Sequence, residues 1–332
     1  MNRLDAQAYV DGVRGGDRAI LARAITLIES EQPAHAVLAQ EVLEALLPHT
    51  GGSYRVGVSG VPGAGKSTFI DAMGILLTGK GHRVAVLAVD PTSSVSGGSI
   101  LGDKTRMSAL SNDPNAFIRP SPTSGTLGGV ARKTRETILL CEAAGFDVVL
   151  VETVGVGQSE TIVAGMVDFF LVLLIAGAGD ELQGIKRGIL EVADMLAINK
   201  ADGDNRPRAI RAQASYQSAL RLMRGGSVPP VVTCSALEKT GLDELWELVV
   251  QSRSERDESG ELQETRREQQ VQWMWDMVED GLRRALRTDS DLASLIHELE
   301  EAVGQGRATP SAAALKVLRR FAERATDALS RG

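Results

Sequence analysis

The strongest constraint on the fold is a glycine-rich motif at residues 60–67, which reads GVPGAGKS. A β-prone apolar run covers residues 54–59 before it, and a helical pattern covers residues 67–77 after it. In such a strand–loop–helix unit, the backbone N–H groups of the loop and the positive N-terminal end of the helix surround a phosphate group. The motif therefore predicts a P-loop in an α/β fold.

Two side chains of this motif have the chemistry that a bound triphosphate needs. Lys66 is expected to bridge the β- and γ-phosphates, and the hydroxyl of Ser67 is expected to join the shell of Mg²⁺, an ion that prefers oxygen ligands. The predicted phosphate-binding residues are Gly60, Pro62, Gly63, Ala64, Gly65, Lys66, Ser67 and Thr68.

A second motif, NKAD at residues 199–202, follows another apolar run and predicts the base. The carboxylate of Asp202 can accept hydrogen bonds from both N1–H and the exocyclic amine of guanine, whereas adenine has no such donor pair. A strand-like run at residues 229–233 opens into Ser235 and Ala236, the S-A element that backs the base in GTPases. The predicted base-binding residues are Asn199, Lys200, Asp202, Ser235, Ala236 and Leu237, and the expected cofactors are GTP or GDP with Mg²⁺.

Length and charge narrow the classes of function. The 332 residues leave room for extensions at both ends, because one nucleotide-binding domain needs roughly 200 residues. A formal net charge of −7 disfavours a nucleic-acid partner. The sequence has no apolar run of about 18 residues and no secretory-type apolar core near Met1, so we expect no membrane partner and a cytoplasmic location.

Apolar runs alternate with helical patterns through the middle of the chain, which indicates a mostly parallel sheet covered by helices on both faces. In such a sheet, ligands bind beyond the carboxyl ends of the strands, where the motifs above fall. We expect a helical N-terminal extension at residues 1–50, a P-loop GTPase domain at residues 51–255 and a helical C-terminal arm at residues 256–332. The apolar stripe of the arm, which includes Trp275, predicts a homodimer through the C-terminal helices, with a monomeric helical lid as the alternative.

Three acidic side chains are candidates for magnesium binding and hydrolysis. Asp90 and Asp103 lie in a stretch rich in Ser, Thr, Gly and Pro, and the alternative for both is a solvated loop. Glu152 follows a strand in the string ETVGVGQSE, where many GTPases carry aspartate, and Gly155 is expected to offer its N–H to the γ-phosphate. The predicted magnesium ligands are Ser67, Asp90, Asp103 and Glu152, and the predicted catalytic residues are Lys66, Asp90, Asp103 and Glu152.

Two further features concern regulation. Val156 follows Gly155, so no glutamine stands where Ras-like proteins orient the attacking water, and slow intrinsic hydrolysis is expected. The string GAGDELQGIKRG at residues 177–188 combines glycines with charges, which suits a loop that signals to a partner protein. Its candidate residues are Gly177, Asp180, Glu181, Gln183 and Lys186, and the alternative is an exposed charged loop with no such role.

Taken together, the strings GVPGAGKS, DPTSS, ETVGVGQSE, GDELQGIK and NKAD resemble the MeaB family of GTPases, to which ArgK and the human MMAA protein are related. The resemblance covers nearly the whole chain. It implies a P-loop fold of the SIMIBI, metallochaperone-like class and a homodimer joined through its C-terminal helices. It also implies a GTP-dependent chaperone that binds methylmalonyl-CoA mutase, gates delivery of adenosylcobalamin and protects the mutase from inactivation.

Two other functions stay open on the same fold. A nickel-insertion GTPase for hydrogenase or urease maturation would use a His-rich tail or paired cysteines, whereas the four histidines of this chain are scattered. A non-catalytic GTP-binding scaffold would hold the nucleotide without hydrolysing it, and the three acidic candidates disfavour it.

Overall fold

The computed structural model describes residues 4–89, 107–120, 127–153, 159–177, 187–224, 228–288 and 290–329. The chain divides into two compact units, Met1–Gln269 and Gln270–Gly332. The helix α11 (Glu261–Thr288) contains the boundary between them.

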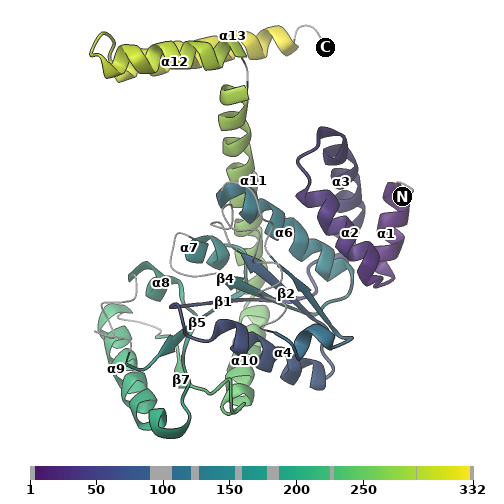
Figure 1. Ribbon diagram of the computed structural model, residues 1–332, viewed down its shortest axis with the longest axis vertical. Coiled ribbons are helices and arrows are strands. Elements are labelled where there is room, and N and C mark those ends of the chain that lie inside the picture. The colour runs from purple at the N-terminus through teal and green to yellow at the C-terminus, as the bar shows by residue number, and fades with distance from the viewer. Residues whose placement is uncertain are drawn as a thin grey trace. The chain divides into compact units, whose positions relative to one another are not determined.

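A seven-stranded sheet forms the centre of the first unit, and all of its neighbouring strands run parallel, as expected from the sequence (Figure 1). The strand order is β3-β2-β4-β1-β5-β6-β7, so the chain reverses its direction of winding beside the central strand β1. Ligands bind at such a switch point in doubly wound sheets. The strands are β1 (Tyr54–Gly60), β2 (Val84–Val89), β3 (Ala116–Arg119), β4 (Val148–Thr153), β5 (Phe169–Ile175), β6 (Met195–Asn199) and β7 (Val231–Thr233).

The strands are apolar on both faces because each face carries its own core. In β2, for example, Val84 and Val86 belong to one buried cluster, whereas Ala85, Leu87 and Val89 belong to the other. This alternation follows from the two-residue period of a strand. The helices of the first unit are α1 (Ala6–Arg14), α2 (Arg18–Glu29), α3 (Pro33–Leu46), α4 (Lys66–Gly79), α6 (Leu127–Ala143), α7 (Ser159–Ala164), α8 (Arg187–Val192), α9 (Arg206–Arg224) and α10 (Leu242–Glu258).

The three N-terminal helices belong to the same unit as the sheet. They pack on α6, and their buried side chains, such as Leu21 and Ile25, share a cluster with the strands. Arg119 at the end of β3 binds Glu29 at the end of α2 with its guanidinium group. The N-terminal helices therefore complete one face of the core.

A buried ion pair fixes the first part of α11 to the amino end of the sheet. Arg266 donates from Nε and Nη2 to the two carboxylate oxygens of Asp168 at 2.8 and 2.6 Å, and also to the carbonyl oxygens of Gly51 and Ser53, both at 2.6 Å. Asp168 accepts a further bond of 2.8 Å from the backbone N–H of Arg55. The two charged groups are thus paired and also hydrogen-bonded to the backbone.

The second unit contains the rest of α11 with α12 (Ser290–Gly304) and α13 (Pro310–Leu329), and the last two helices pack on each other. Apolar side chains remain exposed on α11, among them Met274, Trp275 and Leu282, and on α13, where Leu315 and Leu318 are exposed. Within the described ranges, no helix combines the length and the apolar character needed to cross a membrane.

We predict that Arg266→Met lowers the free energy of unfolding by about 3–5 kcal/mol, because the buried carboxylate of Asp168 loses its compensating charge. The measurement is the midpoint of denaturation in urea. Arg267→Met is the matched control, since Arg267 is the next residue on the same helix and pairs with Glu264 at the surface. A loss below about 1 kcal/mol for Arg266→Met would contradict the stabilising role of the pair.

Candidate functional site

The P-loop follows β1 and depends on glycines at its turns. Gly60 has a φ of +150°, and a Cβ atom at this position would lie 2.2 Å from the carbonyl oxygen of Leu173. Gly63 and Gly65 have φ values of +78° and +85°, which other residues adopt only with strain. The N-cap of α4 is Gly65, which has no side chain to bond the first backbone N–H groups of the helix, and such groups suit an anion.

The polar side chains of the motif meet carboxylates at the start of α4. Lys66 donates from Nζ to the carbonyl oxygen of Gly60 at 2.9 Å, and the hydroxyl of Ser67 donates to Glu152 Oε1 at 3.1 Å. Burial lowers the pKa of Lys66, while the negative charges of Glu152 and Glu160 act in the opposite direction. The two neighbouring carboxylates thus offset part of the effect of burial on the pKa of Lys66, which is lowered overall.

The oxygen atoms at Ser67 and Glu152 suit a magnesium ion. The hydroxyl of Ser67 and the carboxylate of Glu152 are both oxygen ligands, and Mg²⁺ usually takes one or two protein ligands along with phosphate oxygens and waters. Among the described residues, no group of three or more His, Cys, Asp or Glu side chains is gathered as a metal site. The site therefore fits an ion that is shared with a bound phosphate.

The side chain of Asn199 joins the two halves of the site. Asn199 is 1% exposed, donates from Nδ2 to the carbonyl oxygen of Ala64 in the P-loop at 2.8 Å, and accepts from the backbone N–H of Ala236 at 3.1 Å. Because β6 and β7 are parallel neighbours, the loops after them lie side by side and bring Asp202 into contact with the hydroxyl of Ser235. Residues that are predicted to bind the base are thus hydrogen-bonded to residues that are predicted to bind the phosphates.

Lys200 has an unusual backbone conformation at this junction. Its φ is +60°, in the left-handed region. The carbonyl oxygen of Lys200 accepts a bond of 2.7 Å from the side chain of Asn205, which lies in the short turn before α9. Leu237, the last of the predicted base-binding residues, is 78% exposed.

Glu160 is a residue of the site to which the sequence pattern assigns no role. It lies in the first turn of α7, is 2% exposed, and its charge acts on Lys66. A glutamate in the first turn of a helix is ordinary, because it complements the helix dipole, so its type and position do not point to the P-loop. A parallel sheet brings it there, since β4 pairs with β1 and α7 follows β4.

Several predicted residues lie outside the described part of the chain. These are Asp90, Asp103, Gly155, Asp180, Glu181, Gln183 and Lys186. Gly177, the first residue of the proposed signalling loop, is described and has a φ of +82°. Leu110, just after the segment that contains Asp103, donates its backbone N–H to Asp71 of α4 at 2.9 Å.

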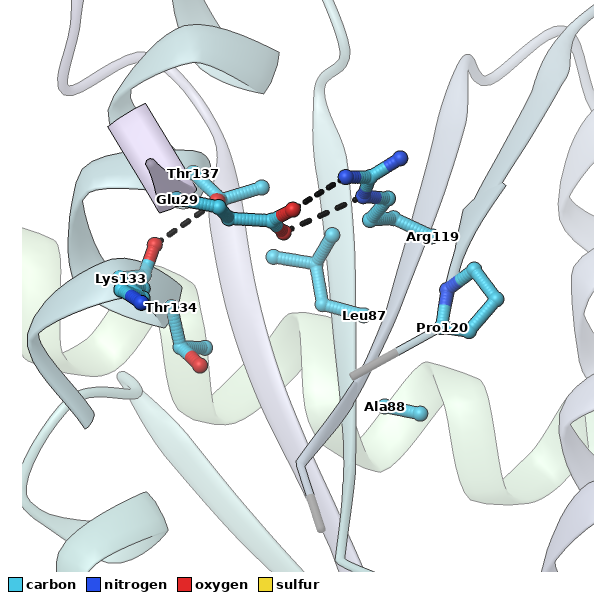
Figure 2. Close-up of a pocket in the computed structure, with 8 residues that line it drawn as sticks. All are labelled: Glu29, Leu87, Ala88, Arg119, Pro120, Lys133, Thr134 and Thr137. Atoms are coloured by element: carbon cyan, nitrogen blue, oxygen red, sulfur yellow. Dashed lines mark hydrogen bonds and ion pairs between the residues drawn. The ribbon is translucent and has the colours of Figure 1, made fainter. Parts of the chain in front are cut away.

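A small hollow lies near the carboxyl ends of β2 and β3, against α2 and α6 (Figure 2). Its charged side chains are already paired: Arg119 binds Glu29, and Lys133 lies 3.6 Å from the carboxylate of Glu31. The hollow marks the place where the N-terminal helices close on the sheet.

Comparison with known proteins agrees with this geometry. Residues 21–291 match the model of the family described as "Methylmalonyl Co-A mutase-associated GTPase MeaB". The chain is 53% identical to GTPase ArgK of Escherichia coli (strain K12) over 282 residues, which are 84% of this chain and 85% of that protein. It is 48% identical to the mitochondrial methylmalonic aciduria type A homolog of Mus musculus over 338 residues, covering 96% of this chain and 81% of that protein.

A solved structure extends the similarity to the fold. The crystal structure of LAO/AO transport system kinase superposes with a TM-score of 0.77 at 41% sequence identity, and the match covers 97% of this chain and 99% of that one.

We predict that Asn199→Ala weakens GDP binding by about 10- to 100-fold and destabilises the protein by about 1–3 kcal/mol, since the carbonyl of Ala64 and the N–H of Ala236 lose their buried partner. Isothermal titration calorimetry measures the affinity, and urea denaturation measures the stability. Asn112→Ala removes an exposed amide that donates to the carbonyl oxygen of Ser108, and it should change neither quantity. Unchanged GDP binding by Asn199→Ala would contradict the bridging role.

Proposed function

Because this chain belongs to the MeaB family of GTPases, we propose that it is a GTP-hydrolysing chaperone of methylmalonyl-CoA mutase. In this proposal it binds the mutase, gates delivery of adenosylcobalamin and protects the mutase from inactivation. The observation that most directly supports nucleotide binding is that Asn199 bonds both the P-loop and the loop after β7. The family match over residues 21–291 supports the mutase as the client.

The phosphate end of the nucleotide would lie in the P-loop. Lys66 would leave the carbonyl of Gly60, the last residue of β1, for the β- and γ-phosphates. The residues proposed to hold the phosphates are Gly60, Pro62, Gly63, Ala64, Gly65, Lys66, Ser67, Thr68 and Gly155. The negative charges of Glu152 and Glu160 would act on the lysine in this site.

The guanine base would lie between the loops that follow β6 and β7. Asp202 would accept from the base, and its present bond from the Ser235 hydroxyl orients the carboxylate for that task. Asn199, Lys200, Ala236 and Leu237 would complete the base site.

Hydrolysis would depend on the group of oxygen ligands at Ser67 and Glu152, together with Asp90 and Asp103 from the sequence. Bound Mg²⁺ would supply positive charge to the phosphates. Glu152 lies near the end of β4, and its carboxylate is 3.1 Å from the Ser67 hydroxyl. From this position it would accept a hydrogen bond from a water molecule and orient it. With Val156 in place of a glutamine, we infer a slow intrinsic rate that the partner stimulates.

Two regions would connect the nucleotide to the partners. Residues 177–186, with Gly177, Asp180, Glu181, Gln183 and Lys186, would report the nucleotide state to the mutase. The exposed apolar side chains of α11 and α13 support a homodimer through the C-terminal helices, because a row of such residues is costly in water.

We predict that Asp202→Asn changes the base preference from GTP toward xanthosine triphosphate, because an amide offers a donor where xanthine has a carbonyl. Affinity for GTP should fall by about 100-fold or more, since buried polar groups are left unpaired. Competition binding with the two nucleotides measures the change, and a melting curve checks that the fold is retained. Unchanged affinity for GTP would refute the base assignment.

The proposed function is tested by GTP turnover with and without purified methylmalonyl-CoA mutase. We expect the mutase to raise the rate of GTP hydrolysis several-fold. Glu152→Gln should lower the stimulated rate by about 10- to 100-fold, and its affinity for GDP should stay within about threefold of the wild type. Glu238→Gln, an exposed residue next to the base loop, is the matched control and should keep the full rate.

Binding to the mutase without stimulation would leave a non-catalytic scaffold as the better description. Neither binding nor stimulation would overturn the proposed client.

A further inference from the structure

The helix α9 has a charge unlike that of the rest of the chain. Its 19 residues contain five arginines and no acidic residue, in a protein with a formal net charge of −7. At 1.5 Å per residue, the helix extends for about 28 Å. Figure 1 shows it beyond β7, at the outer edge of the sheet.

One side of α9 holds it firmly to the sheet. Ala209, Ala212, Tyr216 and Leu220 recur every three or four residues and are buried in the core cluster. The edge strand β7 is bonded to the same helix, since Val231 accepts from the side chain of Gln213 at 2.7 Å and donates to that of Gln217 at 3.3 Å. The opposite side is therefore a fixed surface.

That opposite side presents unpaired positive charge. Arg206, Arg208, Arg211 and Arg221 are exposed, and none of them forms an ion pair with the described residues. Elsewhere in the first unit, arginines such as Arg266 and Arg119 are paired with carboxylates. Arg206, Arg208, Arg211 and Arg221 thus have no carboxylate partner in the described part of the chain and can pair with acidic groups of another molecule.

Apolar side chains lie among the arginines. Ile210 is 53% exposed, Leu222 is 89% exposed and Met223 is 41% exposed. Arg211, Ser218 and Leu222 follow one another at helical spacing, so charge and apolar surface share one ridge. This combination is typical of protein interfaces, in which arginine is enriched and lysine is depleted.

The helix is also joined to the base site. It begins immediately after the turn of residues 203–205, where Asn205 bonds the carbonyl oxygen of Lys200 at 2.7 Å. The first turn of α9 therefore follows directly on the segment that carries Asp202.

We propose that the outer face of α9, defined by Arg208, Arg211, Arg221, Ile210 and Leu222, is a docking surface for an acidic face of the client mutase. The inference rests on the proposed function, because it takes the mutase as the occupant. A nucleic acid fits less well, since the chain is acidic overall and the aromatic residue of the helix, Tyr216, is buried. An anionic membrane fits less well, because the only aromatic residue of this helix, Tyr216, is buried and cannot serve as an interfacial anchor.

The test is the affinity of the full-length protein for methylmalonyl-CoA mutase, measured by biolayer interferometry at about 50 and about 300 mM salt. The variant is Arg208→Ala, Arg211→Ala and Arg221→Ala combined. We expect its Kd to rise by about 10- to 100-fold at low salt and its salt dependence to become weaker. GDP affinity and melting temperature should stay unchanged, because these side chains are exposed.

Two controls distinguish docking on α9 from a nonspecific effect of the total positive charge. Arg14→Ala, Arg18→Ala and Arg267→Ala combined removes the same charge from other exposed positions of the first unit and should bind like the wild type. Leu222→Ser should weaken binding but keep the salt dependence, because it removes apolar contact alone.

Other outcomes would overturn the inference in distinct ways. Wild-type binding that the α9 variant retains would refute the docking surface and leave the proposed function standing. Absence of wild-type binding would refute both. If the α9 variant binds the mutase normally but has a different mass by light scattering, the face is an interface between copies of this chain. If it binds the mutase normally but loses affinity for RNA or for anionic vesicles, the face binds that ligand instead.

Discussion

The buried amide of Asn199 is the contact on which the two halves of the nucleotide site depend. Asn199, at the end of β6, bonds the P-loop at Ala64 and the loop after β7 at Ala236. The P-loop and the loop after β7 are therefore joined through two hydrogen bonds of one side chain. The helix α9 begins four residues after Asp202, so it follows directly on the loop after β6.

The sequence predicts those parts of the molecule whose cause is local. Residues 54–79 form a strand, a glycine turn and a helix, as the periodicity of the sequence predicts. The turn needs backbone with positive φ, and Gly60, Gly63 and Gly65 provide it. The parallel sheet follows from strands that are apolar on both faces. The prediction that the base motif lies beside the P-loop also succeeds, because the carboxyl ends of parallel strands share one edge of a sheet.

Contacts between distant segments leave no such pattern. Glu160 looks like an ordinary first-turn residue, and its position near Lys66 depends on which strands are neighbours. Arg266 looks like one more charge on a long polar helix, yet it is buried against Asp168, 98 positions earlier. The packing of the N-terminal helices on α6 belongs to the same class, since an amphipathic helix does not specify which surface covers it. The roles of Asp90 and Asp103 remain predictions from the sequence.

The pairing of Asp168 with Arg266 also has a consequence for synthesis of the chain. Asp168 precedes β5 and is buried, and the charge that balances it belongs to a helix made much later. A nascent chain that has emerged only as far as β7 holds every strand of the sheet, but it lacks the cation for the carboxylate at the amino end of β5. Because domains fold as their segments leave the ribosome, this edge of the core stays open to water until residue 266 emerges. The final docking of α11 is then the step that converts the growing polypeptide into a closed domain.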